Sequence, residues 1–168
     1  MLHQEPLEVI VGRLLEQRRM TLALAESCTG GLISHRITNV PGSSAYYMGA
    51  VVSYANEVKT SLLQVQPLTL AQHGAVSQET ALEMAHNVRH LFGADVSLSV
   101  TGIAGPSGGS PEKPVGLVYV GLAIVEGARV ERHEFHEDHG DCDSRMANKA
   151  QFAEAALRLL YRHLIGQV

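Results

Sequence analysis

Tryptophan is absent from this chain of 168 residues, and cysteine occurs only twice. Two cysteines cannot supply the disulfide framework on which small secreted domains depend. Cys28 and Cys142 are also too far apart in sequence to form a closely spaced pair of metal ligands. We therefore expect both to be free thiols in a reducing compartment.

Long apolar runs and an excess of positive charge are missing as well. No run reaches the length of a bilayer span, and residues 1–6 lack the basic and apolar regions of a secretion signal. The formal net charge is -4, so the chain has no general attraction to nucleic acid or to an anionic membrane. These absences predict a cytoplasmic protein in which a local site holds any anionic ligand. The oligomeric state stays open, a homo-oligomer included.

The pattern of apolar residues predicts one α/β domain over residues 1–168. A chain of this length buries a sizeable core without disulfides, and no repeat, low-complexity tract or linker divides it. Helical and strand patterns alternate through the first two thirds, and two strands then form a hairpin around Gly127. The expected fold is a three-layer α/β/α sandwich with a mixed sheet of about five strands. The expected helices cover residues 6–19, 31–38, 56–63, 67–72, 78–92 and a last segment capped by Ser144, and the expected strands cover 21–25, 48–54, 95–100, 117–125 and 129–135.

The first candidate site is the turn that follows the apolar run 21–25. Ser27 and Thr29 offer hydroxyl groups there, and Gly30 and Gly31 allow a ligand to approach the backbone closely. If the next helix begins just after these glycines, its unpaired amides would favour an anion or a developing oxyanion. The alternative is a plain helix cap and turn.

The second candidate site is the polar cluster after the strand expected at 48–54. If Asn56 caps the following helix, Lys59 falls in the first helical turn, where the helix dipole lowers the pKa of an ammonium group. A lysine that loses its proton easily can act as a base, and Tyr54 lies beside it in sequence. The alternative is a solvated helix lysine with a tyrosine at a strand end.

The third candidate site is the glycine-rich segment between the strands expected at 95–100 and 117–125. Such a loop exposes several backbone amides and suits the close approach of a phosphate or ribose. Arg145 is expected in the first turn of the last helix, where a cation is poorly placed for the helix dipole and therefore points to an anion from elsewhere. The loop residues expected to contact a ligand are Thr101, Gly102, Ile103, Ala104 and Gly105.

Histidine and acidic residues gather between His133 and His139, which suggests a metal site as an alternative. Strand geometry turns successive side chains to opposite faces, and no second cluster of ligands is present in the sequence. We therefore expect no metal and no cofactor.

Several motifs in one order resemble the CinA C-terminal domain family. They are Ala25-Glu26-Ser27-Cys28-Thr29-Gly30-Gly31, Pro41-Gly42-Ser43-Ser44, Val52-Ser53-Tyr54-Ala55-Asn56-Glu57-Val58-Lys59, His73-Gly74-Ala75-Val76-Ser77, Thr101-Gly102-Ile103-Ala104-Gly105-Pro106, Gly108-Gly109 and Lys113-Pro114-Val115-Gly116. Characterised enzymes of this family are nicotinamide-nucleotide amidohydrolases. The resemblance implies hydrolysis of the carboxamide of nicotinamide mononucleotide (NMN) to nicotinate mononucleotide and ammonia, by a stand-alone form of the domain.

The resemblance also implies roles for single residues. The nucleophilic serine of the family corresponds to Ser27, its lysine to Lys59 and its tyrosine to Tyr54, and Ser44 and Asn56 lie in matching motifs expected to contact the substrate. The family commonly has Gly-Asp-Arg before the last helix. Here Asp143 and Ser144 precede the matching Arg145, after a longer loop that contains Cys142.

These residues predict serine-dependent amide hydrolysis. Ser27 would attack the carboxamide carbon, and neutral Lys59 would accept the serine proton directly or through Tyr54. Amides near Thr29, Gly30 and Gly31 would hold the oxyanion, while Arg145 and loop amides would meet the phosphate. Cys28 is the rival nucleophile, because a thiol at a helix start can be acidified. A catalytically silent nucleotide-binding or regulatory module and a metal-dependent hydrolase are the alternatives.

Overall fold

A computed structural model describes residues 5–135 and 142–168. Its centre is a mixed five-stranded sheet in the order β2-β1-β3-β4-β5. Strands β1, β2 and β3 run parallel to one another, whereas β3, β4 and β5 pair in antiparallel fashion. The strands are β1 (Leu22–Glu26), β2 (Tyr47–Val52), β3 (Val96–Gly102), β4 (Leu117–Ile124) and β5 (Gly127–Glu134).

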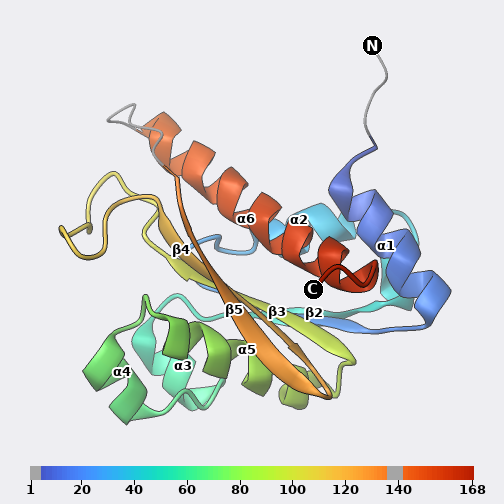
Figure 1. Cartoon of the computed structure of the whole chain (residues 1–168), viewed down its shortest axis with the longest axis horizontal. Coiled ribbons are helices and arrows are strands. Elements are labelled where there is room, and N and C mark those ends of the chain that lie inside the picture. The colour runs from blue at the N-terminus through green and yellow to red at the C-terminus, as the bar shows by residue number, and fades with distance from the viewer. Residues whose placement is uncertain (1–4, 136–141) are drawn as a thin grey trace.

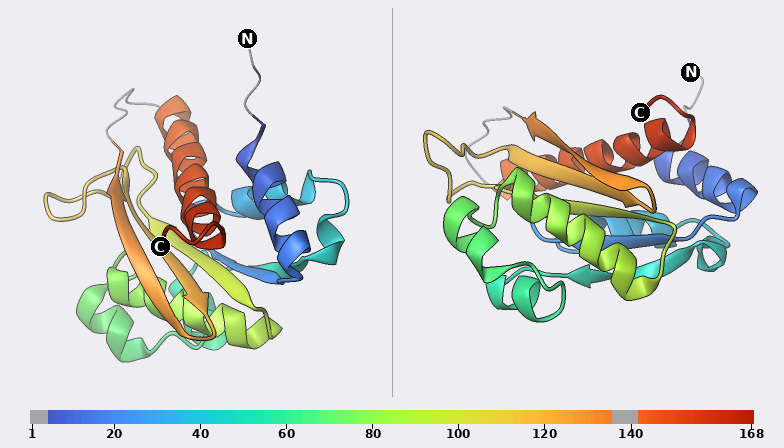
Figure 2. Two further views of the ribbon diagram at one scale, coloured as in Figure 1. Left: turned by 45° about the vertical axis from the view of Figure 1, so that its right-hand side comes forward. Right: turned by 60° about the horizontal axis from the view of Figure 1, so that its bottom comes forward.

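Helices cover both faces of this sheet, which confirms the predicted α/β fold with a mixed five-stranded sheet. Helices α1 and α6 lie side by side on one face together with α2, and α3, α4 and α5 lie on the other (Figures 1 and 2). The helices are α1 (Leu7–Arg18), α2 (Leu32–Thr38), α3 (Asn56–Ser61), α4 (Pro67–His73), α5 (Gln78–Phe92) and α6 (Cys142–Leu164), with a short 3-10 helix, η1 (Ser43–Ala45), before β2.

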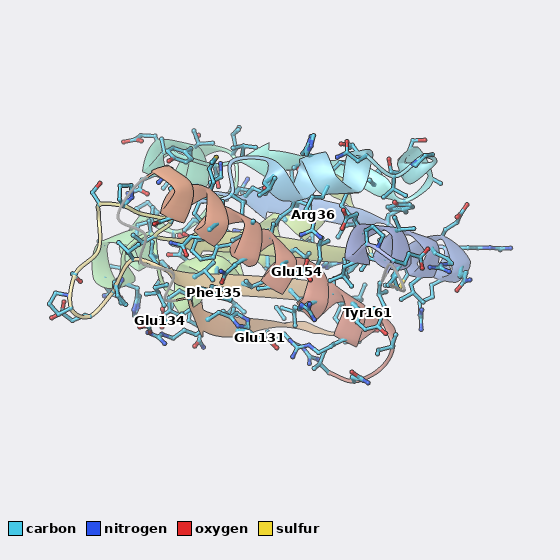
Figure 3. All side chains as sticks on the ribbon, turned by 90° about the horizontal axis from the view of Figure 1, so that it is seen from above. Arg36, Glu131, Glu134, Phe135, Glu154 and Tyr161 are labelled. Carbon is cyan, nitrogen blue, oxygen red and sulfur yellow. The ribbon has the colours of Figure 1, made fainter. Side chains whose placement is uncertain are left out.

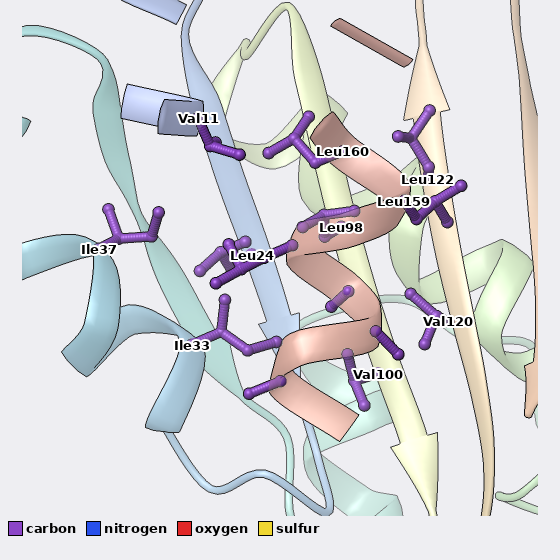
Figure 4. Close-up of a cluster of buried hydrophobic side chains, with 14 of the residues drawn as sticks. Val11, Leu24, Ile33, Ile37, Leu98, Val100, Val120, Leu122, Leu159 and Leu160 are labelled. Atoms are coloured by element: carbon purple, nitrogen blue, oxygen red, sulfur yellow. The ribbon is translucent and has the colours of Figure 1, made fainter. Parts of the chain in front are cut away.

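The two layers of core differ in the size of their side chains. On the α6 face, leucines and valines of β1, β3 and β4 meet the leucines of α6, and Ile33 and Ile37 of α2 close one side (Figure 4). On the α5 face the strands present small residues, so that the hydroxyls of Ser97 and Ser99 donate hydrogen bonds to carbonyls of α5. Gly121 of β4 also allows α5 to approach the sheet closely, since a Cβ atom at this position would lie 2.7 Å from the carbonyl oxygen of Ala81. The α5 helix is therefore held tightly against the sheet.

Local signals predicted most element ends to within two residues, and the helix caps account for two errors. Ser77 does cap α5, where its hydroxyl accepts a hydrogen bond from the amide of Thr80. Asn56 was expected to cap α3, but Ala55 occupies that position and Asn56 is the first helical residue. Ser144 does not cap α6 either, because that helix already begins at Cys142.

Some large apolar side chains of the helices lie on the surface. Leu82 and Leu91 of α5 are exposed, and Met146 of α6 is exposed too. The buried stripe of α5 contains Ala81, Met84, Ala85 and Val88, and its alanines allow the helix to sit close to the strands. None of the described helices is both long and apolar enough to cross a membrane.

Candidate active site

The carboxyl ends of the three parallel strands meet at one edge of the sheet, and each ends in a polar segment. Ser27 follows β1 and Ser53 follows β2, while Thr101 lies at the end of β3. Main-chain hydrogen bonds tie these ends together, because the amide of Ser27 donates to Val100 and that of Ser53 donates to Glu26. In open α/β sheets this edge is the usual position of a ligand site.

A cavity of about 270 Å³ opens at this edge. Its lining residues come from all three candidate segments of the sequence, from the connection between α4 and α5, and from α6. They are Ser27, Cys28, Tyr54, Asn56, Lys59, Ala75, Val76, Thr101, Gly102, Ile103, Ala104, Gly105, Ser107, Gly108 and Arg145.

Ser27 and Lys59 form the reactive pair of this cavity. Nζ of Lys59 lies 3.0 Å from Oγ of Ser27 and donates a hydrogen bond of 2.6 Å to the carbonyl oxygen of Ser53. Only 1% of Lys59 is exposed, so it is not the solvated helix lysine of the alternative interpretation. The geometry matches a nucleophile and a base within hydrogen-bond reach.

The pKa of the Lys59 ammonium is lowered, chiefly by burial. Among the described residues no carboxylate forms an ion pair with Lys59, so its buried ammonium has no negatively charged partner there. The sequence predicted the direction of this shift correctly but assigned it to the dipole of α3. That helix has only six residues, and removal of the side chain from water is the stronger effect.

The backbone amides after Ser27 do not form the expected oxyanion site. The amides of Gly31 and Ile33 donate to the carboxylate of Glu26, and the amide of Gly30 donates to the carbonyl oxygen of Ser27. Because of these hydrogen bonds, the completely buried carboxylate of Glu26 itself occupies the positive end of α2. Thr29 is committed as well, because its hydroxyl donates to the same carboxylate at 2.7 Å. None of Thr29, Gly30 and Gly31 lines the cavity.

Tyr54 stands at the mouth of the cavity and is 62% exposed. Its hydroxyl accepts a hydrogen bond of 2.8 Å from Nη2 of Arg145, whose Nη1 donates to the carbonyl oxygen of Gly105 at 2.6 Å. Within the described part of the chain, Tyr54 makes no hydrogen bond to Ser27 or Lys59. A direct proton transfer between serine and lysine is therefore favoured over one through the phenol.

The glycine-rich segment lines the cavity as the sequence predicted. The hydroxyl of Thr101 donates to the carbonyl oxygen of Ala75 and so fixes a neighbouring wall of the cavity. The amides of Ala104 and Gly105 donate no hydrogen bond to any described residue, which leaves them available to a ligand. Gly102 must lack a side chain, since a Cβ atom there would lie 2.5 Å from the carbonyl oxygen of Leu117.

Two predicted ligand contacts differ in outcome. Asn56 lines the cavity and is exposed, so its amide can reach a ligand. Ser44 lies before β2, and β2 begins beside Leu22 at the start of β1. It is therefore at the opposite end of the strands from Ser27, and the expected contact with a ligand in this cavity is wrong.

Cys28 is buried, and this burial raises the pKa of its thiol to about 12. A thiol of that acidity carries almost no thiolate at neutral pH, and only the thiolate is a good nucleophile. The positive end of α2 was expected to acidify Cys28, but the carboxylate of Glu26 already neutralises it. Ser27, paired with Lys59, is the better candidate nucleophile.

A larger cavity of about 400 Å³ lies between β5 and α6, away from Ser27. Its charged lining residues are already paired, since Arg162 binds Glu131 of β5 at 2.6 Å and Arg158 binds Glu154 at 2.9 Å. Glu154 also pairs with Arg36 of α2, and Figure 3 labels these two residues together with Glu131, Phe135 and Tyr161. With its charges already paired, this cavity lacks the reactive pair of the smaller one.

The predicted alternative of a metal site at the histidine cluster cannot be built from the described residues. No group of three or more histidine, cysteine or acidic side chains in residues 5–135 and 142–168 is arranged to hold a metal ion. His136 and His139 lie outside those ranges. His133 is in β5, where its ring stacks on Phe135 with centroids 5.9 Å apart.

Reasoning from the sequence missed three residues of the site. Glu26 and Asn148 are buried polar residues that hold the turn and the glycine-rich loop, and the carbonyl group of Ser53 anchors Lys59. An acidic residue at the end of a strand, directly before a helix start, was the available signal for Glu26. No local pattern marks Asn148, whose partner Ala104 lies 44 positions away.

Comparisons with known proteins identify the family of this chain. The CinA C-terminal domain family matches residues 4–164. A CinA-like protein of Salinibacter ruber is 49% identical over 94% of this chain, and a competence-damage inducible protein of Moorella thermoacetica is 48% identical over 97%. The chain spans only 37% and 38% of the lengths of these two curated relatives.

Solved structures extend the likeness to the fold. A CinA superfamily protein of Klebsiella pneumoniae superposes with a TM-score of 0.88 at 33% identity, over 95% of this chain and 96% of that one. The competence/damage inducible protein CihA of Agrobacterium tumefaciens gives 0.77 at 38% identity, over 96% and 99%. Matched across nearly its whole length in sequence and in fold, this chain belongs to the CinA C-terminal domain family.

Proposed function

We propose that this protein hydrolyses the carboxamide of NMN, yielding nicotinate mononucleotide and ammonia, with Ser27 as the nucleophile. The observation that carries the proposal is the distance of 3.0 Å between Oγ of Ser27 and Nζ of Lys59, inside a cavity at the carboxyl ends of the strands. An amide is a poor electrophile, so hydrolysis near neutral pH needs a nucleophile, a base and a site for the oxyanion. The cavity has candidates for all three.

Lys59 acts first as a base. In its neutral form the amine keeps its hydrogen bond to the carbonyl oxygen of Ser53 and turns its lone pair toward the hydroxyl of Ser27. Ser27 attacks the carboxamide carbon as its proton passes to Lys59, and the carbonyl oxygen becomes an oxyanion. The backbone amide of Cys28, a residue that lines the cavity, donates to no carbonyl group of the described residues and is a candidate donor for it.

Lys59 then acts as an acid. It returns the proton to the departing nitrogen, ammonia leaves, and the acyl group stays on Ser27 as an ester. A water molecule gives its proton to neutral Lys59 and attacks this ester, which releases the carboxylate product and restores the hydroxyl. One residue serves both steps because burial lowers its pKa and so makes the neutral amine easier to reach than for an ordinary lysine.

The substrate end of the cavity suits a phosphate. Arg145 lines it with a guanidinium group whose hydrogen-bond partners among the described residues are the neutral oxygens of Tyr54 and Gly105, and these do not neutralise its charge. The free amides of Ala104 and Gly105 add donors at the same wall. A protein with a net charge of -4 can in this way bind an anionic nucleotide.

Ammonia release from purified protein and NMN tests the proposal. We expect turnover in the wild type and none in Ser27→Ala, with unchanged thermal stability and retained NMN binding. Thr60→Ala, on the surface of α3, is the matched control. Turnover that persists in Ser27→Ala rejects Ser27 as nucleophile, and the absence of ammonia from the wild type rejects the reaction.

The second candidate function is a silent nucleotide-binding or regulatory module that uses the same loop. The free amides of Ala104 and Gly105 favour it as much as they favour an enzyme. NMN binding without ammonia release would support this module. A metal-dependent hydrolase, the third alternative, predicts that a chelator abolishes activity.

A further inference from the structure

Asn148 of α6 is a buried amide at the back of the glycine-rich loop. Only 1% of the residue is exposed, and its Nδ2 atom donates a hydrogen bond of 3.0 Å to the carbonyl oxygen of Ala104. Its Oδ1 atom is buried and has no partner among the described residues. Burial of an unsatisfied acceptor is unfavourable, so the hydrogen bond to Ala104 is the interaction that accounts for an asparagine at this position.

The orientation of one peptide group follows from this contact. The bond between Ala104 and Gly105 is trans, and in a planar trans peptide the carbonyl and the next amide point in opposite directions. Asn148 binds the carbonyl from the side of α6, so the amide of Gly105 points away from that helix. Gly105 lines the cavity, and this amide has no acceptor within the described chain.

Arg145 fixes the next carbonyl of the same loop. Its Nη1 atom donates to the carbonyl oxygen of Gly105 at 2.6 Å, one turn of α6 before Asn148. Gly105 itself has φ of 84°, a conformation suited to glycine, and a Cβ atom there would lie 2.5 Å from Cγ1 of Val115. The loop is therefore held from α6 at two successive carbonyls and packed against Val115 from the other side.

We infer that Asn148 is a positioning residue, which sets the Ala104–Gly105 peptide so that the Gly105 amide meets the phosphate of a pyridine nucleoside monophosphate. The inference deepens the proposed function and rests on it. Arg145 supplies the positive charge at this wall of the cavity, and Asn148 orients the neutral Gly105 amide beside it. Loss of Asn148 therefore weakens binding of the phosphate and not of the rest of the ligand.

Calorimetry with NMN and nicotinamide riboside tests this role, because the two ligands differ only by the phosphate. All measurements are made in a Ser27→Ala background, so that no turnover disturbs them. We expect Asn148→Leu to weaken NMN binding by roughly tenfold, the usual effect of losing one hydrogen bond to a charged group. Riboside binding should be unchanged, and the melting temperature should stay within about 5 °C.

Met146→Ala, an exposed position on the same helix, is the matched control and should leave both affinities unchanged. If Asn148→Leu does not fold, Asn148→Ser takes its place, since serine is too short to reach the carbonyl of Ala104. NMN binding by the Asn148 variant as tight as that of the control would overturn the inference. Failure of the proposed function is seen separately, as a wild type that releases no ammonia from NMN.

Discussion

Nζ of Lys59 and Oγ of Ser27 lie 3.0 Å apart although 32 positions separate the two residues in sequence. Parallel pairing of β1 with β2 brings them together, because the segments after both strands then lie at one edge of the sheet. A buried amine in contact with a hydroxyl, with no carboxylate partner among the described residues, is disfavoured as a salt-bridging cation and favoured as a base.

Activity should therefore depend on pH through Lys59. Only the neutral amine accepts the serine proton, so kcat/KM should fall as pH drops through the lowered pKa of Lys59 and reach a plateau above it. The ammonia assay at a series of pH values up to the ordinary lysine pKa of 10.5 measures this profile.

Lys59→Met should lower kcat by about 10²- to 10⁴-fold, the usual contribution of a general base. Lys59→Arg should be equally impaired, since a guanidinium group stays charged and cannot act as a base. Full activity in the arginine variant would contradict the assignment.

Burial of Lys59 should also affect stability. The unfolded lysine keeps its proton up to the ordinary pKa of 10.5, whereas the folded one releases it at lower pH. Between these two values the unfolded state binds more protons, so the free energy of unfolding should rise with pH.

Lys59→Met removes this titrating group. The free energy of unfolding should then rise less steeply with pH between the folded and unfolded pKa values of Lys59. Urea unfolding of both proteins at several pH values between 7 and 10 provides the measurement. Parallel slopes for the two proteins would show that the pKa of Lys59 is the same in the folded and unfolded states.

Much of the fold and part of the site could be predicted from the sequence. Apolar periodicity identified the strands, and the three candidate segments were each placed directly after a strand pattern, at ends that meet in one cavity. Those inferences depend on local pattern and on the rules of parallel sheets. They are correct because Ser27, Lys59 and Thr101 lie at the end of a strand or in the segment that follows one.

The misjudged residues depend on long-range contacts. The amides of Gly30 and Gly31 were expected to face a ligand. The amide of Gly31 instead donates to the carboxylate of Glu26, five positions earlier, and the amide of Gly30 donates to the carbonyl oxygen of Ser27. Ser44 belongs to a recognisable motif, yet the direction of β2 places it at the far end of the strands. Asn148 contacts a loop from a different part of the chain, and no periodicity records such a contact.

Cys28 should be dispensable for activity despite its position next to Ser27. Its thiol has a pKa of about 12 because of burial and remains protonated at neutral pH. Cys28→Ala should retain activity within about threefold, because the change removes a small buried group and no reacting atom. In a Cys142→Ser background, a thiol reagent should label Cys28 slowly in the native protein and rapidly in denaturant. Rapid labelling of the native protein would contradict this burial.

Glu26 should be the most important polar residue for stability near the site. Its carboxylate accepts hydrogen bonds from the amides of Gly31, Ile33 and Ser34 and from the hydroxyls of Thr29 and Ser34, at 2.6 to 3.1 Å. Glu26→Gln replaces one acceptor oxygen by a donor that faces other donors. We expect a loss of about 3 kcal/mol in the free energy of unfolding.

Glu57→Gln is the matched control, because Glu57 is an exposed glutamate of α3 and its replacement should change stability by less than about 0.5 kcal/mol. Urea unfolding compares the two variants with the wild type. Since Ser27 and Glu26 are neighbours, the Glu26 variant should also lose activity in the ammonia assay, even at temperatures where it is fully folded. A Glu26→Gln protein as stable as the control would show that the amides at the start of α2 do not need a negative charge.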